Sequence, residues 1–66
     1  MFIQVNGTER EVPDGATVTE MLAALGVPAR GVAVAVDGVV VTKTDHDRTV
    51  VPDGAEVEVL TAVQGG

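Results

Sequence analysis

The sequence predicts a small α+β domain of two layers, in which a single helix covers one face of a mixed sheet of four or five strands. Three observations lead to this prediction. Two Asn-Gly or Asp-Gly dipeptides each lie between strand-like runs, one short segment has helical periodicity with a capping signal at both ends, and a late segment alternates apolar and acidic residues. Because the sequence has only 66 residues, we expect one domain.

Both predicted hairpins are connected by the same kind of two-residue turn. Asn-Gly and Asp-Gly favour two-residue hairpin turns, because both central residues of such a turn need a positive φ. The turns are Asn6-Gly7, between the runs 2–5 and 8–12, and Asp37-Gly38, between the runs 31–36 and 39–42.

The predicted helix spans residues 18–25 and has signals at both ends. Thr17 and Glu20 have the spacing of a capping box, in which each residue bonds to the backbone of the other. Gly26 stands where a helix commonly ends in a left-handed residue, and Pro28 prevents continuation. Within the helix, apolar residues follow at helical spacing and predict one buried face: Val18, Met21, Leu22 and Leu25.

The last predicted strand spans residues 56–60, with Val57 and Val59 on one face. A hairpin, a helix and then strands is the order of the β-grasp fold, so we expect the first and last strands to lie parallel at the centre of the sheet. Residues 1–60 would form the domain, and 61–66 a flexible tail ending in Gly-Gly. The predicted core is Ile3, Val5, Val18, Met21, Leu22, Leu25, Val57 and Val59.

Composition and charge exclude several classes of function. The net charge is −6 and the four basic residues are scattered, which argues against a nucleic-acid partner and suits a basic protein partner. We find neither a basic-then-apolar leader nor an apolar run of transmembrane length. We therefore expect a cytoplasmic protein without a membrane partner, with the monomer as the default state.

No pattern of catalytic or metal-binding residues is present, so we predict that the protein is not an enzyme. Cysteine is absent, and none of the ten carboxylates stands out as half of an acid–base pair. His46 lies between Asp45 and Asp47, which are too few converging ligands for a metal. We expect these three residues to belong to a solvated loop at 43–49.

The chemistry points instead to the main-chain carboxylate of Gly66. Glycine has no Cβ, so a Gly65-Gly66 end can enter a narrow channel of another protein. A terminal carboxylate is ionised and unreactive until an enzyme activates it, most simply as an acyl adenylate. A domain without a nucleophile of its own is therefore expected to be a substrate or carrier.

Over its whole length the chain resembles the ThiS family, the small ubiquitin-like sulfur carrier proteins of thiamine biosynthesis. The similarity is carried by residues 3–7 (Ile-Gln-Val-Asn-Gly), by the Thr-led helix, by residues 32–36 (Val-Ala-Val-Ala-Val) and above all by the end, Thr-Ala-Val-Gln-Gly-Gly. Residues 41–47 depart from the pattern, because they lack the Pro, Arg and Trp that the family usually has there.

The resemblance implies a reaction sequence in which this chain binds no cofactor itself. A ThiF-type adenylating enzyme would use ATP and Mg²⁺ to adenylate Gly66. Sulfur from a cysteine desulfurase would then give a C-terminal thiocarboxylate, from which thiazole synthase would build the thiazole ring. Val63, Gln64 and Gly65 would be recognised as the tail.

We also predict a partner surface on the sheet face that the helix leaves uncovered. By strand alternation Phe2 and Leu60 point to this face, and Ala62 would continue it into the tail. Glu56 and Glu58 would border the patch and suit a basic-rimmed groove of the adenylating enzyme.

Three other functions stay open at this point. A molybdopterin-synthase small subunit would be a carrier with the same chemistry, a ubiquitin-like modifier would form isopeptide bonds with lysine, and a plain interaction domain would not use its tail. A thiocarboxylate product would distinguish a carrier from a modifier. An unchanged phenotype after deletion of Gly65 and Gly66 would favour the interaction domain.

Overall fold

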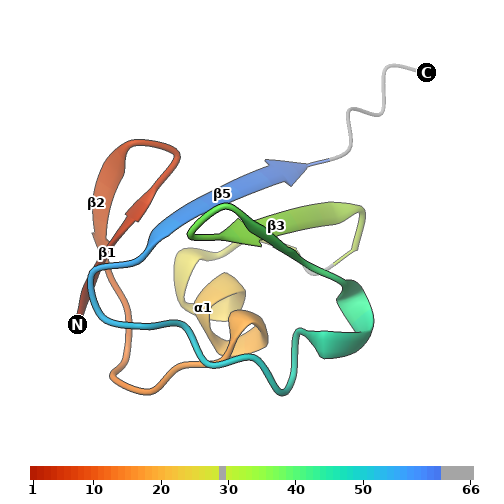
Figure 1. The fold of residues 1–66 in the computed structure, drawn as a ribbon, viewed down its shortest axis with the longest axis horizontal. Helices are drawn as coiled ribbons and strands as arrows, with labels where there is room; N and C mark the ends of the chain where they lie inside the picture. Colours follow the sequence, from red (N-terminus) through yellow and green to blue (C-terminus); the bar gives the residue numbers. More distant parts are fainter. Residues whose placement is uncertain (29, 62–66) are drawn as a thin grey trace.

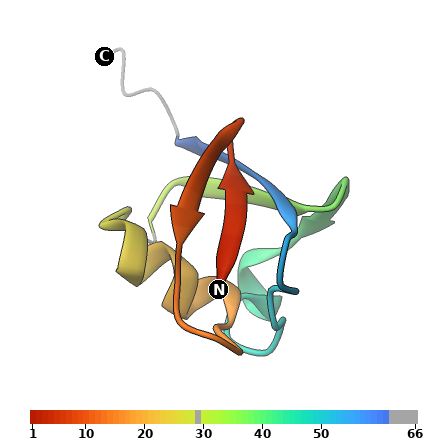
Figure 2. The same ribbon diagram turned by 90° about the vertical axis from the view of Figure 1, so that its left-hand side faces the viewer.

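A computed structural model describes residues 1–28 and 30–61. It contains a five-stranded mixed sheet in the order β2-β1-β5-β3-β4, with one helix packed on one face (Figures 1 and 2). This arrangement confirms the predicted α+β class. The elements are β1 (Phe2–Val5), β2 (Thr8–Glu11), α1 (Val18–Leu25), β3 (Val32–Val36), β4 (Val39–Val41), the 3₁₀ helix η1 (Lys43–Asp45) and β5 (Glu56–Thr61).

Both predicted hairpins form, and their turns have the expected backbone. Asn6 and Gly7 have φ values of 52° and 83°, and Asp37 and Gly38 have 50° and 83°. Asn and Asp tolerate this left-handed region better than most residues, which explains why they precede glycine here. The turns therefore set antiparallel pairing of β1 with β2 and of β3 with β4.

The interior of the sheet brings together the two ends of the domain. β1 and β5 pair in parallel, with Gln4 opposite Glu56 and Val5 opposite Val57. β3 pairs with the other side of β5 in the antiparallel direction. The predicted parallel pairing of the first and last strands is confirmed.

Helix α1 has the predicted bounds and the predicted caps. The Thr17 hydroxyl accepts from the Glu20 N–H at 3.2 Å, and the Glu20 carboxylate accepts from the Thr17 N–H at 2.9 Å. Gly26 adopts a left-handed conformation with φ 73°, and the Val27 N–H bonds to the Leu22 carbonyl at 2.9 Å. The helix thus satisfies backbone groups at both ends within its own neighbourhood.

The core lies between α1 and the sheet face that it covers. Seven of the eight predicted core residues are buried, and Leu25, at the last turn of the helix, is partly buried against them. Further buried apolar residues come from segments where the sequence shows no clear alternation: Val12, Ala16, Val34, Val36, Val41, Val51 and Ala55.

The segment 43–49 is exposed or partly exposed, as the sequence predicts, at every residue except His46. His46 is only 4% exposed, and its Nε2 lies 3.2 Å from the Val41 carbonyl. A carbonyl only accepts, so Nε2 carries the hydrogen of this bond. The segment folds back over the start of α1, where the His46 carbonyl accepts from the Thr19 N–H at 3.1 Å. The expectation of a solvated His46 is therefore wrong.

Candidate functional site

The candidate site lies at the end of β5, from which residues 62–66 continue. β5 reaches Thr61, one residue beyond the predicted end of the domain. The predicted tail residues lie outside the described residues, and their roles stay predictions: Ala62, Val63, Gln64, Gly65 and Gly66. The described part of the site is therefore the base of the tail and the surface around it.

Hydrogen bonds from both neighbouring elements fix the end of β5. β3 pairs with it as far as Thr61, which lies opposite Val32. On the other side the Asn6 side chain binds both backbone groups of Val59. Its Nδ2 donates to the Val59 carbonyl at 3.0 Å, and its Oδ1 accepts from the Val59 N–H at 2.9 Å. Position and direction of the tail base are thus set by the sheet.

Leu60 projects from this base onto the uncovered sheet face and is 69% exposed. Residues opposite each other on paired strands share a face, which identifies its apolar neighbours. Ala33 lies opposite Leu60, Ala35 opposite Glu58, and Val40 opposite Ala35. We call the four residues Ala33, Ala35, Val40 and Leu60 the tail-side patch.

A shallow hollow adjoins this patch at the end of the sheet. Its volume is about 450 Å³, and it is lined by Gly31, Val32, Ala33, Lys43, Leu60 and Thr61. Lys43 adds a cation beside a mostly apolar surface. This combination can receive an apolar side chain of a partner protein next to the tail.

Phe2 does not join the tail-side patch, although it is exposed on the same face. The Phe2 carbonyl accepts from the Gly54 N–H at 2.9 Å, which places Phe2 beside the start of β5. Leu60 follows Gly54 by six residues, or about 20 Å at ~3.3 Å per residue. The predicted single patch of Phe2 and Leu60 is therefore two separate places, with exposed Glu56 and Glu58 between them.

The other half of the uncovered face is acidic. β2 pairs with β1 so that Glu9 lies opposite Gln4 and Glu11 opposite Phe2. Both glutamates thus share the face of Glu56 and Glu58. Sequence reasoning missed Glu9 and Glu11, although the two-residue turn at Asn6-Gly7 already fixes their partners on β1.

A second hollow, of about 430 Å³, lies over the first half of β5 and is lined by Gln4, Asn6, Gly7, Gly38, Glu56, Val57 and Glu58.

Within residues 1–28 and 30–61, no three His, Asp or Glu side chains come together as metal ligands. No helix in that part is long and apolar enough to cross a membrane.

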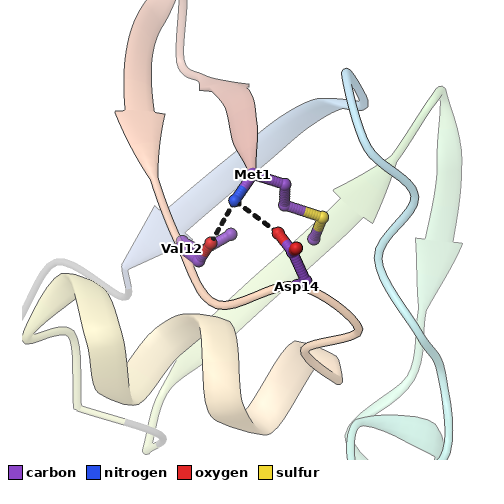
Figure 3. A network of polar contacts seen from close by, with 3 residues as sticks. All are labelled: Met1, Val12 and Asp14. Carbon is purple, nitrogen blue, oxygen red and sulfur yellow. Dashed lines mark hydrogen bonds and ion pairs between the residues drawn. The ribbon is translucent and has the colours of Figure 1, made fainter.

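An ion pair lies beside the start of β1 and the segment that follows β2 (Figure 3). The Met1 α-ammonium group donates to the Val12 carbonyl at 2.8 Å and to Asp14 Oδ1 at 2.7 Å. The hydrogen bond with Asp14 raises the pKa of the amine above 8.0 and lowers the pKa of Asp14 below 3.8. This contact holds the ends of β1 and β2 together and is remote from the tail base.

The geometry so far describes a β-grasp domain whose interior strand leads into a Gly-Gly end. The sequence profile of the ThiS family matches residues 3–66. The chain belongs to the ThiS family. The match includes both the turn at Asn6 and the tail to Gly66, so the resemblance predicted from the sequence is confirmed over nearly the whole chain.

Two solved structures and one further protein are similar to this ThiS-family chain. It is 39% identical to a thiamine biosynthesis protein (ThiS) from Geobacter metallireducens, whose crystal structure superposes with a TM-score of 0.84 over 100% of both chains. A solution NMR structure of a thiamine biosynthesis protein from that organism gives 39% identity and a TM-score of 0.82, over 100% of this chain and 88% of the other. A thiazole synthase from Paramagnetospirillum magneticum is 35% identical over 66 residues, and the chain spans 20% of that protein's length.

Proposed function

We propose that this ThiS-family chain is a sulfur carrier in thiamine biosynthesis and has no catalytic activity of its own. The observation that carries the proposal is the family match, which extends through the tail to Gly66. The fold supports it, because the hydrogen-bonded end of β5 holds the base of that tail at the surface.

The proposed chemistry takes place at the main-chain carboxylate of Gly66. A carboxylate oxygen attacks the α-phosphorus of ATP on an adenylating enzyme, forming an acyl adenylate and releasing pyrophosphate. The outer sulfur of a donor persulfide then attacks the carbonyl carbon and displaces AMP, which forms an acyl disulfide. A second thiol attacks the donor's sulfur in this disulfide, which releases the thiocarboxylate and leaves the donor in a disulfide with that thiol. Because the sequence contains no cysteine, no thiol side chain in this chain can take over the sulfur.

The proposed partners follow from these steps. A ThiF-type enzyme binds ATP and Mg²⁺ and activates the tail, a cysteine desulfurase supplies sulfur, and thiazole synthase takes the sulfur from the thiocarboxylate. The similarity to a segment of a protein named thiazole synthase supports the last partner. We place the reaction in the cytoplasm, where ATP is available to the adenylating enzyme.

The docking surface for the adenylating enzyme is proposed to be the tail-side patch. Leu60 is the last apolar residue of the chain before the tail among those described, and the adjoining hollow provides a recess beside it. The tail contacts proposed for Val63, Gln64 and Gly65 would continue this interface into the channel of the enzyme.

The decisive experiment follows the mass of the chain during incubation with the adenylating enzyme, ATP, Mg²⁺ and a sulfur donor. We expect replacement of one oxygen by sulfur at Gly66. Adding one C-terminal alanine, or making Gly65→Val, should abolish the conversion, because the first displaces the carboxylate and the second adds a side chain that crowds the channel.

Two controls keep this result specific. Thermal unfolding of both variants should match the unmodified chain, and Arg48→Ala, an exposed change in the 43–49 segment, should still be converted. Conversion of the extended chain without prior trimming would contradict the proposal. A lysine adduct in place of a thiocarboxylate would identify a protein modifier instead.

A further inference from the structure

The two edges of the sheet differ in how they are protected from pairing with other strands. β2 carries Glu9, Arg10 and Glu11, all exposed, and charged residues discourage strand addition at an edge. β4 has only valines, of which Val39 is 67% and Val40 70% exposed. An exposed apolar edge strand of this kind is a template for another strand.

The backbone of β4 has hydrogen-bonding groups that point away from the sheet. In a two-residue hairpin the residues that flank the turn, here Val36 and Val39, exchange both backbone hydrogen bonds. The next residue, Val40, therefore directs its N–H and C=O to the outer edge. Among residues 1–28 and 30–61, no turn or loop group bonds to the backbone of Val40.

We propose that the occupant of this edge is the β4 strand of a second copy of this chain, paired in the antiparallel direction about a two-fold axis through Val40. In this register each Val40 faces its counterpart and Val39 faces Val41 of the other copy, so all three valines overlap. The interface is self-complementary, as a two-fold contact requires.

The charges beside β4 favour this orientation. Asp37 precedes the strand and Lys43 follows it, so antiparallel pairing brings the acidic end of one strand to the basic end of the other. Parallel pairing would bring like charges together. Asp37 keeps one carboxylate oxygen on the Glu56 N–H at 2.8 Å, so its charge is held in place at the turn.

The dimer is expected to depend on concentration. Three residues on each side bury much less than the roughly 1,200 Å² of stable complexes, and the charge of −6 on each copy opposes association. β3 separates β4 from β5, so both tail bases stay accessible. The inference therefore holds or fails independently of the proposed sulfur chemistry.

The first test uses single cysteines in a chain that has none. In the dimer the two Val40 Cα atoms lie about 5.5 Å apart, inside the range for a disulfide, whereas the two Val39 Cα atoms are offset to more than about 8 Å. Val40→Cys should oxidise to a covalent dimer several-fold faster than Val39→Cys, its almost equally exposed neighbour. Equal rates would overturn the proposed register.

The second test measures amide hydrogen exchange of the unmodified chain over a range of protein concentrations. The Val40 N–H should exchange more slowly as the concentration rises. Glu9 is the matched control, since it occupies the same hairpin position on the β2 edge and should not change. Val40→Pro removes the outward N–H without removing a bond to β3, and should abolish concentration dependence in sedimentation.

Two other results of the exchange experiment would contradict pairing with a second copy of this chain. Protection of Val40 that appears only when an adenylating enzyme or thiazole synthase is added would mean that a strand of that partner occupies the edge. If the exchange rate of Val40 changes neither with protein concentration nor with an added partner enzyme, the β4 edge stays unpaired.

Discussion

Asn6 has two separate functions in this small domain. Its φ of 52° forms the first half of the β1–β2 turn. Its side-chain amide also continues the β1–β5 ladder beyond Val5, because it donates to and accepts from Val59 as a backbone peptide group would. One residue therefore couples the first turn of the chain to the base of the tail. Hydrogen bonds of this kind contribute about 0.5–1.5 kcal/mol each.

The ion pair between Asp14 and the Met1 amine predicts how the stability of the fold depends on pH. The raised pKa of the Met1 amine means that its ion pair stabilises the fold below pH 8.0 and loses this effect as the pH rises through the folded-state value. The lowered pKa of Asp14 means that the effect is present above pH 3.8 and is lost as the pH falls through the folded-state value.

The Asp14→Asn variant should therefore be less stable than the natural chain mainly between pH 3.8 and 8.0. Because the group is exposed, the effect should be small and should decrease with added salt. Urea denaturation across this range measures it, with Glu58→Gln as a control for loss of one exposed carboxylate. A difference that is the same at every pH would show that the ion pair does not contribute.

At the scale of elements, the start of α1 depends on a segment that comes much later in the chain. The Val18 N–H donates to the Thr49 carbonyl at 2.9 Å and the Thr19 N–H to the His46 carbonyl at 3.1 Å. The Thr19 hydroxyl also hydrogen bonds to Asp47. Together with the Thr17 cap, these bonds satisfy the first N–H groups of the helix. The segment 43–49 is thus part of the helix cap.

His46 fixes this cap to the sheet, so we predict that His46→Ala loosens the helix start. Loss of the buried bond to the Val41 carbonyl should lower the free energy of unfolding by about 1–3 kcal/mol. The Thr19 amide should gain more in exchange rate than the Ile3 amide, which lies on β1 and is separated from β4 by β5 and β3. Thr44→Ala, an exposed neighbour, is the control, and uniform acceleration of all amides would contradict a local role.

At the scale of the whole molecule, the uncovered sheet face has two parts with different properties. The tail-side patch is apolar and lies beside the last strand residues, whereas four glutamates occupy the part over β2, β1 and the start of β5. A partner that reaches the tail must lie over the first part, and basic residues of that partner can face the second.

This division predicts different effects of two otherwise identical changes. Leu60→Asp should weaken binding to the adenylating enzyme by tenfold or more, about 1.4 kcal/mol, because it places a charge at the centre of the contact. Phe2→Asp, about 20 Å away along the sheet, should have a much smaller effect. Circular dichroism checks that both variants stay folded, and isothermal titration measures the affinity. Equal losses would show that the interface covers the whole face.

The sequence alone determined the local features of this protein. The turns at Asn6-Gly7 and Asp37-Gly38, the bounds of α1 and half of the buried core follow from positive φ values, a capping box and the spacing of apolar residues. All of these depend on residues within a few positions of each other. The family resemblance was also legible in the sequence, since it rests on contiguous motifs including the tail.

Only the tertiary structure decided which distant residues lie together. The sequence does not give the offset between β1 and β5, which separates Phe2 from Leu60. Nor does it give the pairing of β3 with β5, which places Val40, beside Ala35, in the same patch as Leu60. His46 lies in a polar stretch whose composition predicts solvent exposure, yet it is buried in a segment whose carbonyls cap a helix some thirty residues earlier. Contacts between segments far apart in the chain depend on how the elements pack, and no local pattern encodes that packing.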